Sequence, residues 1–340
     1  MGFAFREKIS AGIEMSEDRI RAAAVVGKAE GVFIQHLETL KIPENTLIPG
    51  FKQLNVKDVD ALSACLKKAC PRTRSKKIHV ALPDACVKVL IQRITDLPED
   101  VSDIDRMLLW RIAANYDIPE QELRISWENR GKDSEDRHVF LVAVSREPVM
   151  AQYETVFKTA GIRPVLLTPA GLARLNFYAP TLPEKGIMAY LGLFDEIISL
   201  FVVAGGLPLF YWVARKGTFR KDGDSAINEV DLLIQYFNSE FPENEIEKFF
   251  IASYIKSENL MEQIFENLRN IDFVILDETQ LIHSLQGRQR KIQASPDFTF
   301  VDETSLIQWD YPSADGTPLD DNPLPFYTAA LGAAQRDMGR

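Results

Sequence analysis

An order of predicted elements that occurs twice is the feature that most constrains the fold of this chain. Each half reads as a strand, a hairpin, a helix, a strand and a helix, and the halves meet at a proline-rich segment, 180–185. Strands that alternate with helices are typical of α/β folds. The repeated unit is far longer than the roughly 20–50 residues of a solenoid repeat, which excludes a solenoid. We therefore expect two related α/β domains that face each other across a central cleft.

Apolar periodicity and turn residues place the individual elements. The predicted strands span 20–26, 32–40, 78–82, 87–94, 122–128, 138–145, 163–167, 187–191, 248–254 and 272–276. The predicted helices span 57–70, 103–116, 148–160, 169–178, 224–241, 258–270 and 325–336. We expect Ser102 to cap the second helix, because a serine oxygen can accept from the free N–H groups of the first turn. Gly161 is expected to end the third helix in a left-handed conformation.

The run 197–214 has no charged residue and is, by length alone, a marginal candidate for a membrane-spanning helix. Its centre is Gly205-Gly206-Leu207-Pro208, which would break an isolated helix in a bilayer. Its flanks are rich in β-branched and aromatic residues. Two strands joined by a Gly-Gly turn explain this composition better, so we expect a hairpin and no membrane span.

Charge and the N-terminal residues limit the class of partner and the location. The 340 residues include 49 acidic and 39 basic residues, for a net charge of −10. This balance disfavours a nucleic-acid-binding protein, which normally presents a basic face to the phosphates. Arg6, Glu7 and Lys8 precede any apolar stretch, so no secretory signal is expected. We predict a cytoplasmic location.

The common catalytic and metal-binding motifs are absent from the sequence. It contains no phosphate-binding P-loop, no dinucleotide-binding glycine motif and no nucleophile elbow. The four histidines, His36, His79, His138 and His283, have no partners at metal-ligand spacing. We therefore predict no metal site and no catalytic residues. An α/β enzyme of an unrelated family remains an alternative, but it would need a convergent polar site that the sequence does not indicate.

Seven segments carry a family resemblance through their order and spacing. They are 12–16 (GIEMS), 81–83 (ALP) with 97–98 (LP), 110–119 with its Tyr-Asp-Ile-Pro end, 141–144 (LVAV), 160–164 (AGIRP), 206–210 (GLPLF) and 329–334 (AALGAA). Over nearly its whole length the chain resembles the PilM-type pilus assembly proteins of the actin-like ATPase superfamily. Relatives in that superfamily are FtsA and the cytoplasmic part of the type II secretion L protein.

This resemblance implies an actin-like fold with particular domain limits. The first domain would span 1–180 and include an inserted subdomain at about 78–147. The second would span 186–340, and its C-terminal helix 325–336 would return to the first domain. Proteins of this superfamily bind ATP between the two halves, where glycines let backbone N–H groups approach the phosphates.

The resemblance places the first phosphate loop at Glu14, Ser16, Glu17 and Asp18. The superfamily typically has D-x-G followed by small polar residues there, whereas this chain has no glycine and two additional carboxylates. A carboxylate about 4 Å from a phosphate charge costs about 4 kcal/mol at an effective dielectric constant of 20. The first loop is therefore a poor match for a nucleotide.

The resemblance places the second phosphate loop at Tyr190, Gly192 and Asp195. The typical pattern there is D-x-G-x-x-x-T, and of its D-x-G only Gly192 remains. The adenosine loop would follow the strand that ends near 251–255, which contains no glycine. We therefore expect a pseudo-ATPase with no enzymatic activity and no cofactor. The alternative is a working ATP-binding protein, with Mg²⁺, whose cleft switches partner binding.

The resemblance also implies a partner. PilM-type proteins hold the N-terminal cytoplasmic tail of an inner-membrane protein, PilN, in a groove between the inserted subdomain and the core of the first domain. Candidates for the wall of that groove are Leu108, Trp110, Ile112, Leu172 and Phe177. At least three of these also fit as core residues, because an apolar stripe at helical spacing usually packs inward. The chain would then be a scaffold of a pilus or secretion machine, held at the inner membrane through its partner and in contact with other components.

Overall fold

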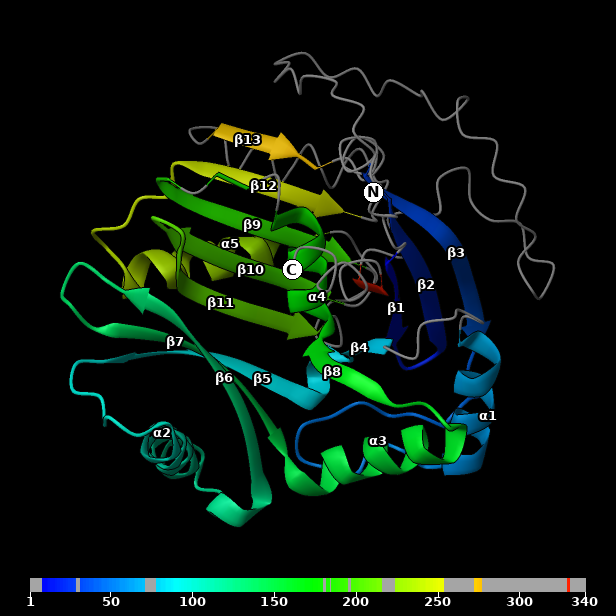
Figure 1. Ribbon diagram of the computed structural model, residues 1–340. Coiled ribbons are helices and arrows are strands. Elements are labelled where there is room, and N and C mark those ends of the chain that lie inside the picture. The colour runs from blue at the N-terminus through cyan, green and yellow to red at the C-terminus, as the bar shows by residue number, and fades with distance from the viewer. Residues whose placement is uncertain are drawn as a thin grey trace, which may run out of the picture.

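The computed structural model describes residues 8–28, 31–70, 78–179, 182–183, 185–194, 197–215, 224–253, 272–276 and 329–330. Within these residues the chain forms three β-sheets, five α-helices and two short 3-10 helices (Figure 1). Two of the sheets have five strands and the third has three. The predicted helix 258–270, and all of the predicted helix 325–336 except residues 329–330, lie outside the described residues.

The first five-stranded sheet has the order β3-β2-β1-β4-β8. Its strands are β1 (Lys8–Met15), β2 (Arg19–Lys28), β3 (Gly31–Lys41), β4 (Ile78–Leu82) and β8 (Pro164–Pro169). β1, β2 and β3 are antiparallel neighbours, whereas β4 and β8 join β1 in parallel. Helices α1 (Val59–Ala69) and α3 (Glu147–Ala160) pack against this sheet and bury one of the hydrophobic cores.

The second five-stranded sheet repeats this pattern in the order β11-β10-β9-β12-β13. Its strands are β9 (Ile187–Phe194), β10 (Ile197–Ala204), β11 (Leu207–Arg215), β12 (Lys248–Ser253) and β13 (Asp272–Ile275). Again three antiparallel strands are followed by two parallel ones. Helix α5 (Asp224–Glu240) packs on this sheet. The prediction of two related α/β halves is confirmed.

The uncharged run 197–214 forms the hairpin β10–β11, as predicted. Gly205 and Gly206 lie in its turn with φ angles of 57° and 81°, a backbone conformation that residues with a Cβ rarely adopt. No helix among the described residues is both long enough and apolar enough to cross a membrane.

The three-stranded sheet has the order β5-β7-β6 and lies between β4 and α3 in the sequence. It comprises β5 (Val87–Ile94), β6 (Leu123–Lys132) and β7 (His138–Arg146), with α2 (Val101–Tyr116) on one face and short helices η1 (Asp84–Cys86) and η2 (Glu120–Glu122) at its ends. The resemblance predicts an inserted subdomain at about 78–147. Residues 78–82 form β4 of the first sheet, and the three-stranded sheet begins at β5.

Two helix ends can be compared with the predictions. Gly161 ends α3 with φ 71°, as predicted. The predicted cap of α2 is wrong, because the helix begins at Val101 and Ser102 lies inside its first turn. The capping position is Asp100, which makes no side-chain capping hydrogen bond.

Helix α4 (Ala170–Tyr178) follows β8, and its residues Leu175, Phe177 and Tyr178 lie in a core shared by the two five-stranded sheets. This core joins side chains of β2, α4, β9, β10 and β12. Ala330 belongs to the same core, and Ala329 is buried against Ala81, Ala170 and Ala173 of the first half. The two described residues near the C-terminus therefore pack against the first half of the chain.

Candidate functional site

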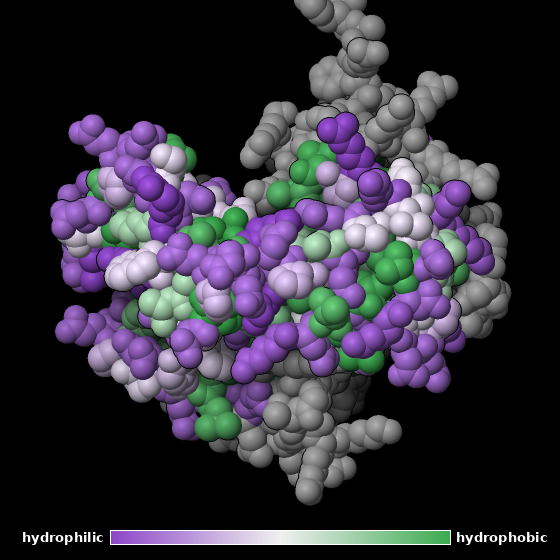
Figure 2. All heavy atoms as spheres, turned by 90° about the horizontal axis from the view of Figure 1, so that it is seen from below, coloured by the Kyte–Doolittle hydropathy of each residue, from purple (hydrophilic) through white to green (hydrophobic). Residues whose placement is uncertain are grey.

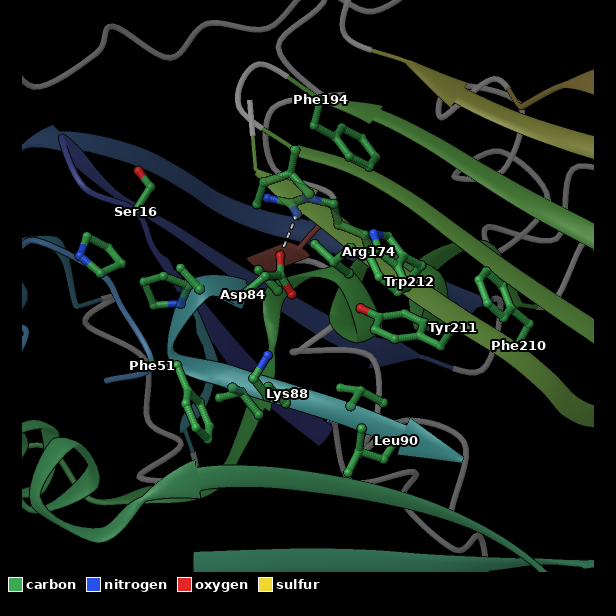
Figure 3. A pocket seen from close by; sticks show the side chains of 18 of the residues that line it. Ser16, Phe51, Asp84, Lys88, Leu90, Arg174, Phe194, Phe210, Tyr211 and Trp212 are labelled. Atoms are coloured by element: carbon green, nitrogen blue, oxygen red, sulfur yellow. Dashed lines mark ion pairs between the residues drawn. The ribbon is translucent and has the colours of Figure 1, made fainter. Parts of the chain in front are cut away.

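A cavity of about 550 Å³ lies where the three sheets meet. The turn after β1 and residues Pro49 and Phe51 border it from the first half, and β5 borders it from the three-stranded sheet. The second half contributes β11 and the C-terminal part of α5. Lys88 also lines the cavity (Figure 3). Its Nζ atom lies 5.3 Å from the ring centre of Phe51 and 5.4 Å from the ring centre of Tyr116.

The deepest part of this cavity is occupied by buried charges centred on Glu14. Arg174 donates to Glu14 Oε1, and Arg21 Nη1 lies 3.4 Å from Glu14 Oε2. The side chains of all three residues are less than a tenth exposed. Glu14 is the seventh residue of β1 and pairs with Arg21 across the β1–β2 ladder, so the antiparallel register itself brings these two side chains together. Buried charges of this kind are stable only when paired, and this carboxylate has two cations.

Asp84 is the second buried carboxylate of the group. Its Oδ2 atom lies 3.5 Å from Arg174 Nη1, and its Oδ1 accepts a hydrogen bond of 2.8 Å from the backbone N–H of Gly171. Burial raises the pKa of Asp84, while Arg174 and the Gly171 N–H act in the opposite direction. Arg174 thus bridges two carboxylates that come from β1 and from the turn after β4 (Figure 3).

Two contacts extend this group into the second half of the chain. The Arg174 guanidinium carbon lies 4.6 Å from the ring centre of Phe194, the last residue of β9. A Cβ atom at Gly171 would lie 2.5 Å from the Tyr211 hydroxyl and 3.1 Å from Asp84 Oδ1. Tyr211 of β11 therefore reaches into contact with α4, and glycine at 171 is required by this close approach. The charged group links both halves across the cleft.

The turn after β1 is held by its own side chains. The Ser16 hydroxyl contacts Asp18 Oδ1 and the Arg19 carbonyl oxygen, each at 3.1 Å. Asp18 pairs with Arg19 at 2.5 Å. Partial burial alone would raise the pKa of Asp18, but hydrogen bonds and the charge of Arg19 leave it below its ordinary value. Glu17 is exposed at the mouth of the cavity.

The five candidate groove residues do not come together. Leu108 and Ile112 are fully buried in the core between α2 and the three-stranded sheet, whereas Trp110 points outward and is 60% exposed. Leu172 and Phe177 belong to the separate core between the five-stranded sheets, where Phe177 is fully buried. Helical spacing alone could not tell a groove residue from a core residue. In α2 the apolar stripe is buried against the three-stranded sheet.

No protein-family model matches the sequence, and no curated protein sequence matches it. Among solved structures, a chain of the PilM-PilN type IV pilus biogenesis complex superimposes with a TM-score of 0.68 at 17% identity, covering 96% of this chain and 98% of that chain. The fold is therefore actin-like. The resemblance in fold that the sequence indicated is confirmed, as is the predicted fold class.

Two further structures superimpose less closely on this actin-like chain. The cytoplasmic domain of EpsL, an inner membrane component of the type II secretion system of Vibrio cholerae, gives a TM-score of 0.47 at 10% identity, covering 84% of this chain and 97% of that one. A protein of unknown function with an actin-like ATPase fold from Bacteroides thetaiotaomicron gives 0.49 at 10% identity, covering 81% and 95%.

The second predicted phosphate loop is filled by side chains. Tyr190 is buried, with its ring centre 5.7 Å from that of Tyr178. Gly192 lies inside β9, and a Cβ atom there would come within 2.5 Å of Ser199 Oγ and 2.6 Å of the Phe194 ring. Close packing between β9 and β10 thus accounts for this glycine. Asp195 lies outside the described residues.

These residues do not fit a Mg-nucleotide at the usual place between the halves. Phosphate binding needs free backbone N–H groups or unpaired cations, and Mg²⁺ needs carboxylate or water oxygens. Here the buried carboxylates Glu14 and Asp84 are paired with Arg174, and the buried Tyr190 occupies the position at which the resemblance predicts an acid. Among the described residues, no three His, Cys, Asp or Glu side chains are grouped as metal ligands.

Three residues of this site were not predicted from the sequence: Arg21, Asp84 and Arg174. A usable signal existed for Arg174, the one charged residue in the apolar helix Ala-Gly-Leu-Ala-Arg-Leu-Asn-Phe-Tyr. A lone cation on such a helix needs a buried acid as its partner. Glu14 was identified, but as part of a loop, because β1 was not predicted as a strand.

Proposed function

We propose that this chain is an actin-like scaffold of a type IV pilus or a related secretion machine, with a nucleotide cleft that has lost its function. The observation that carries the proposal is the buried group of Glu14, Arg21, Asp84 and Arg174, which includes Glu14 of the predicted first phosphate loop. The fold shared with a chain of the PilM-PilN complex supports the assignment to such a machine.

The energetics of the buried charges argue against nucleotide binding. A triphosphate bound by Arg174 would have to take it from Glu14 and Asp84, and breaking a buried ion pair on one side costs about 3–5 kcal/mol. A micromolar ligand binds with only about 8 kcal/mol in total. Losing that much of the binding free energy would weaken such a ligand by roughly two to four orders of magnitude.

We infer that the partner is the N-terminal cytoplasmic tail of an inner-membrane protein that resembles PilN. The structural neighbour is a PilM-PilN complex, which supports a partner of this kind. The partner would hold this chain at the cytoplasmic face of the inner membrane. The face seen in Figure 2 is mainly hydrophilic, with hydrophobic side chains in small separate groups. We place the partner in the cavity, whose lining includes apolar side chains of β5 and β11.

A second candidate function is favoured by the size of the cavity. About 550 Å³ lies within the range of small-molecule sites, roughly 300–1,000 Å³. Lys88 lines it, together with Arg19 and Arg21, which are paired with Asp18 and Glu14. If Arg174 swings away from its carboxylates, a nucleotide could bind and switch the partner site, which is the working ATP-binding alternative.

Calorimetric titration with Mg-ATP, run beside a melting scan, separates the two candidates. We expect no heat of binding and no change in melting temperature. A ligand present at 100 times its Kd would stabilise the fold by about 2.7 kcal/mol, so the melting scan would detect binding. Micromolar binding of Mg-ATP would overturn the proposal that the cleft no longer binds nucleotide, and it would favour the ATP-binding alternative.

The partner is tested by fluorescence anisotropy with a labelled synthetic peptide. The peptide is the N-terminal cytoplasmic tail of the PilN-like protein of the same organism, and a scrambled peptide of the same composition is the control. We expect the native tail alone to bind. Equal binding of both peptides, or of neither, would overturn the assignment of this partner.

A further inference from the structure

Three of the large hydrophobic side chains that remain exposed lie together on the second half of the chain. Leu232 and Tyr236 are one helical turn apart on α5 and are 62% and 44% exposed, and Trp212 of β11 is 44% exposed. The rings of Trp212 and Tyr236 meet edge to face, with their centres 5.5 Å apart. Single exposed hydrophobic side chains are common on protein surfaces, whereas a group of them marks an interaction site.

A carboxylate lies at each end of this apolar stripe. Glu229 precedes Leu232 by three residues, and Glu240 follows Tyr236 by four, so the helix places these four side chains along one face. Neither carboxylate forms an ion pair within the described part of the chain. The surface formed by Glu229, Leu232, Tyr236, Glu240 and Trp212 is termed the α5 patch.

The surroundings of the α5 patch are strongly acidic. Residues 224–247, which comprise α5 and the segment after it, include seven acidic residues and no lysine or arginine. This charge opposes a contact of the patch with its own copy, and it opposes an anionic membrane surface, because both would bring like charges together. It favours a basic protein partner, whose charges would be complementary to the patch.

The arrangement of the apolar side chains also limits the shape of the partner. Leu232 and Tyr236 belong to a row of side chains four residues apart, and such a row packs into the groove between two rows of another helix. Proteins that bind an amphipathic helix contact its apolar face, where the anchoring residues recur every three or four positions. A helix is therefore the partner segment that matches the α5 patch.

We propose that the α5 patch is a docking surface for a basic amphipathic helix of a second protein. Its apolar face packs against Leu232, Tyr236 and Trp212, and its lysine or arginine side chains lie near Glu229 and Glu240. The inference goes beyond the proposed function, because Glu229 and Leu232 lie outside the cavity to which the partner tail is assigned.

A labelled model peptide tests the chemistry of the proposed partner by fluorescence anisotropy. The peptide has leucine at every third or fourth position and lysine at its other positions, so that it forms a basic amphipathic helix. One control peptide has the same composition, but its leucines do not share a helix face. We expect the amphipathic peptide to bind the full chain more tightly than this control. Equal binding would show attraction by charge alone and would overturn the inference.

Two matched pairs of variants test the position of the site with the same peptide. Leu232→Lys should weaken binding about tenfold or more, as expected for a central apolar anchor, whereas Leu54→Lys changes a half-exposed leucine of the first half and should have no effect. Glu240→Lys should weaken binding, whereas Glu243→Lys makes the same charge change outside the patch and should not. Equal effects within each pair would place the binding elsewhere and overturn the inference.

Exchange of charges provides a gain of binding that damage to the fold cannot produce. A peptide with glutamate in place of every lysine should not bind the wild-type chain. It should bind the double variant Glu229→Lys/Glu240→Lys, because both partners have then reversed their charge at the contact. Failure of this peptide to bind the double variant, despite an unchanged melting temperature, would overturn the role of the two carboxylates.

Circular dichroism tests the helical form of the bound peptide. We expect the helical signal of the mixture to exceed the sum of the separate signals, because the peptide becomes ordered on the α5 patch. Binding without a gain in helical signal would overturn helix docking and favour an extended segment.

The remaining outcomes separate this inference from the proposed function. Leu232→Lys should bind the tail of the PilN-like protein as the wild-type chain does, and loss of both peptides in this variant would overturn a separate partner. Failure of the tail to bind the wild-type chain would refute the proposed partner and leave the α5 patch standing. A dimer in sedimentation that Leu232→Lys dissociates would show that a second copy covers the patch, and the inference would be wrong.

Discussion

Arg174 contacts residues that lie 160 and 90 positions before it in the sequence, Glu14 and Asp84, and one that lies 20 positions after it, Phe194. No local pattern could predict these pairs, because each depends on how α4 packs over the ends of β1 and β4. The residue types alone were informative, since a single cation in an apolar helix and a single acid in an apolar strand each require a partner. The sequence thus indicated that charges are buried, but not where they meet.

Arg174→Met should reduce the free energy of unfolding by about 3–5 kcal/mol, because it leaves Asp84 without its nearby cation and Glu14 with Arg21 alone. Urea denaturation followed by circular dichroism measures the change. Arg106→Met is the matched control, since Arg106 pairs with Asp103 at the surface and its replacement should leave the midpoint unchanged. Equal changes in the two variants would contradict a central role for Arg174.

Asp84 should make stability depend on pH in a direction that its pKa defines. Burial raises the folded-state pKa above the ordinary 3.8, so between these two values the folded chain binds more protons than the unfolded chain. The contribution of Asp84 to stability therefore falls as the pH rises through this window and is constant above it. Asp84→Asn lacks this dependence, so its stability relative to wild type should increase as the pH rises from about 4. Denaturation curves at a series of pH values give the difference, and a difference independent of pH would refute the assignment.

At the scale of elements, most strands and helices were predictable, and the failures have identifiable physical reasons. Strands 78–82 and 87–94 were predicted with the observed ends, because each is a short run rich in β-branched residues between turns. β1 was missed, because the segment 8–15 contains a serine, a glycine and a glutamate and does not alternate clearly. Those residues are buried by long-range contacts, with Ala11 and Ile13 fully covered by the first core.

The ends of α2 and α3 allow a paired prediction. Both helices end in the left-handed conformation, α2 at Asp117 with φ 51° and α3 at Gly161 with φ 71°. Asp117→Gly should stabilise the protein by about 0.5–1 kcal/mol, because it relieves backbone strain and removes an acid from a helix C-terminus. Gly161→Ala should destabilise it by about 1 kcal/mol for the converse reason. Thermal melting measures both, and changes of the same sign would show that φ does not control these helix ends.

At the scale of the whole molecule, the repeated order of elements was enough to predict two related halves, and the family resemblance predicted their actin-like fold. The sequence did not reveal how the halves are held together, because that depends on contacts between α4 of the first half and β9 and β11 of the second. In this chain those contacts are made by its own side chains, Phe194 over Arg174 and Tyr211 against Gly171. These contacts join the two halves directly through side chains of the chain itself.

Gly171→Ala tests this arrangement, because its Cβ would lie 2.5 Å from the Tyr211 hydroxyl and would push β11 away from α4. We expect a loss of about 1–3 kcal/mol in the free energy of unfolding, the usual cost of overpacking. The radius of gyration from X-ray scattering should increase as the halves separate. Adding Tyr211→Phe removes the clashing hydroxyl and should restore much of the stability and the compact shape. A double variant no better than Gly171→Ala would place the strain at Asp84, whose Oδ1 would lie 3.1 Å from the same Cβ, and not at the contact between the halves.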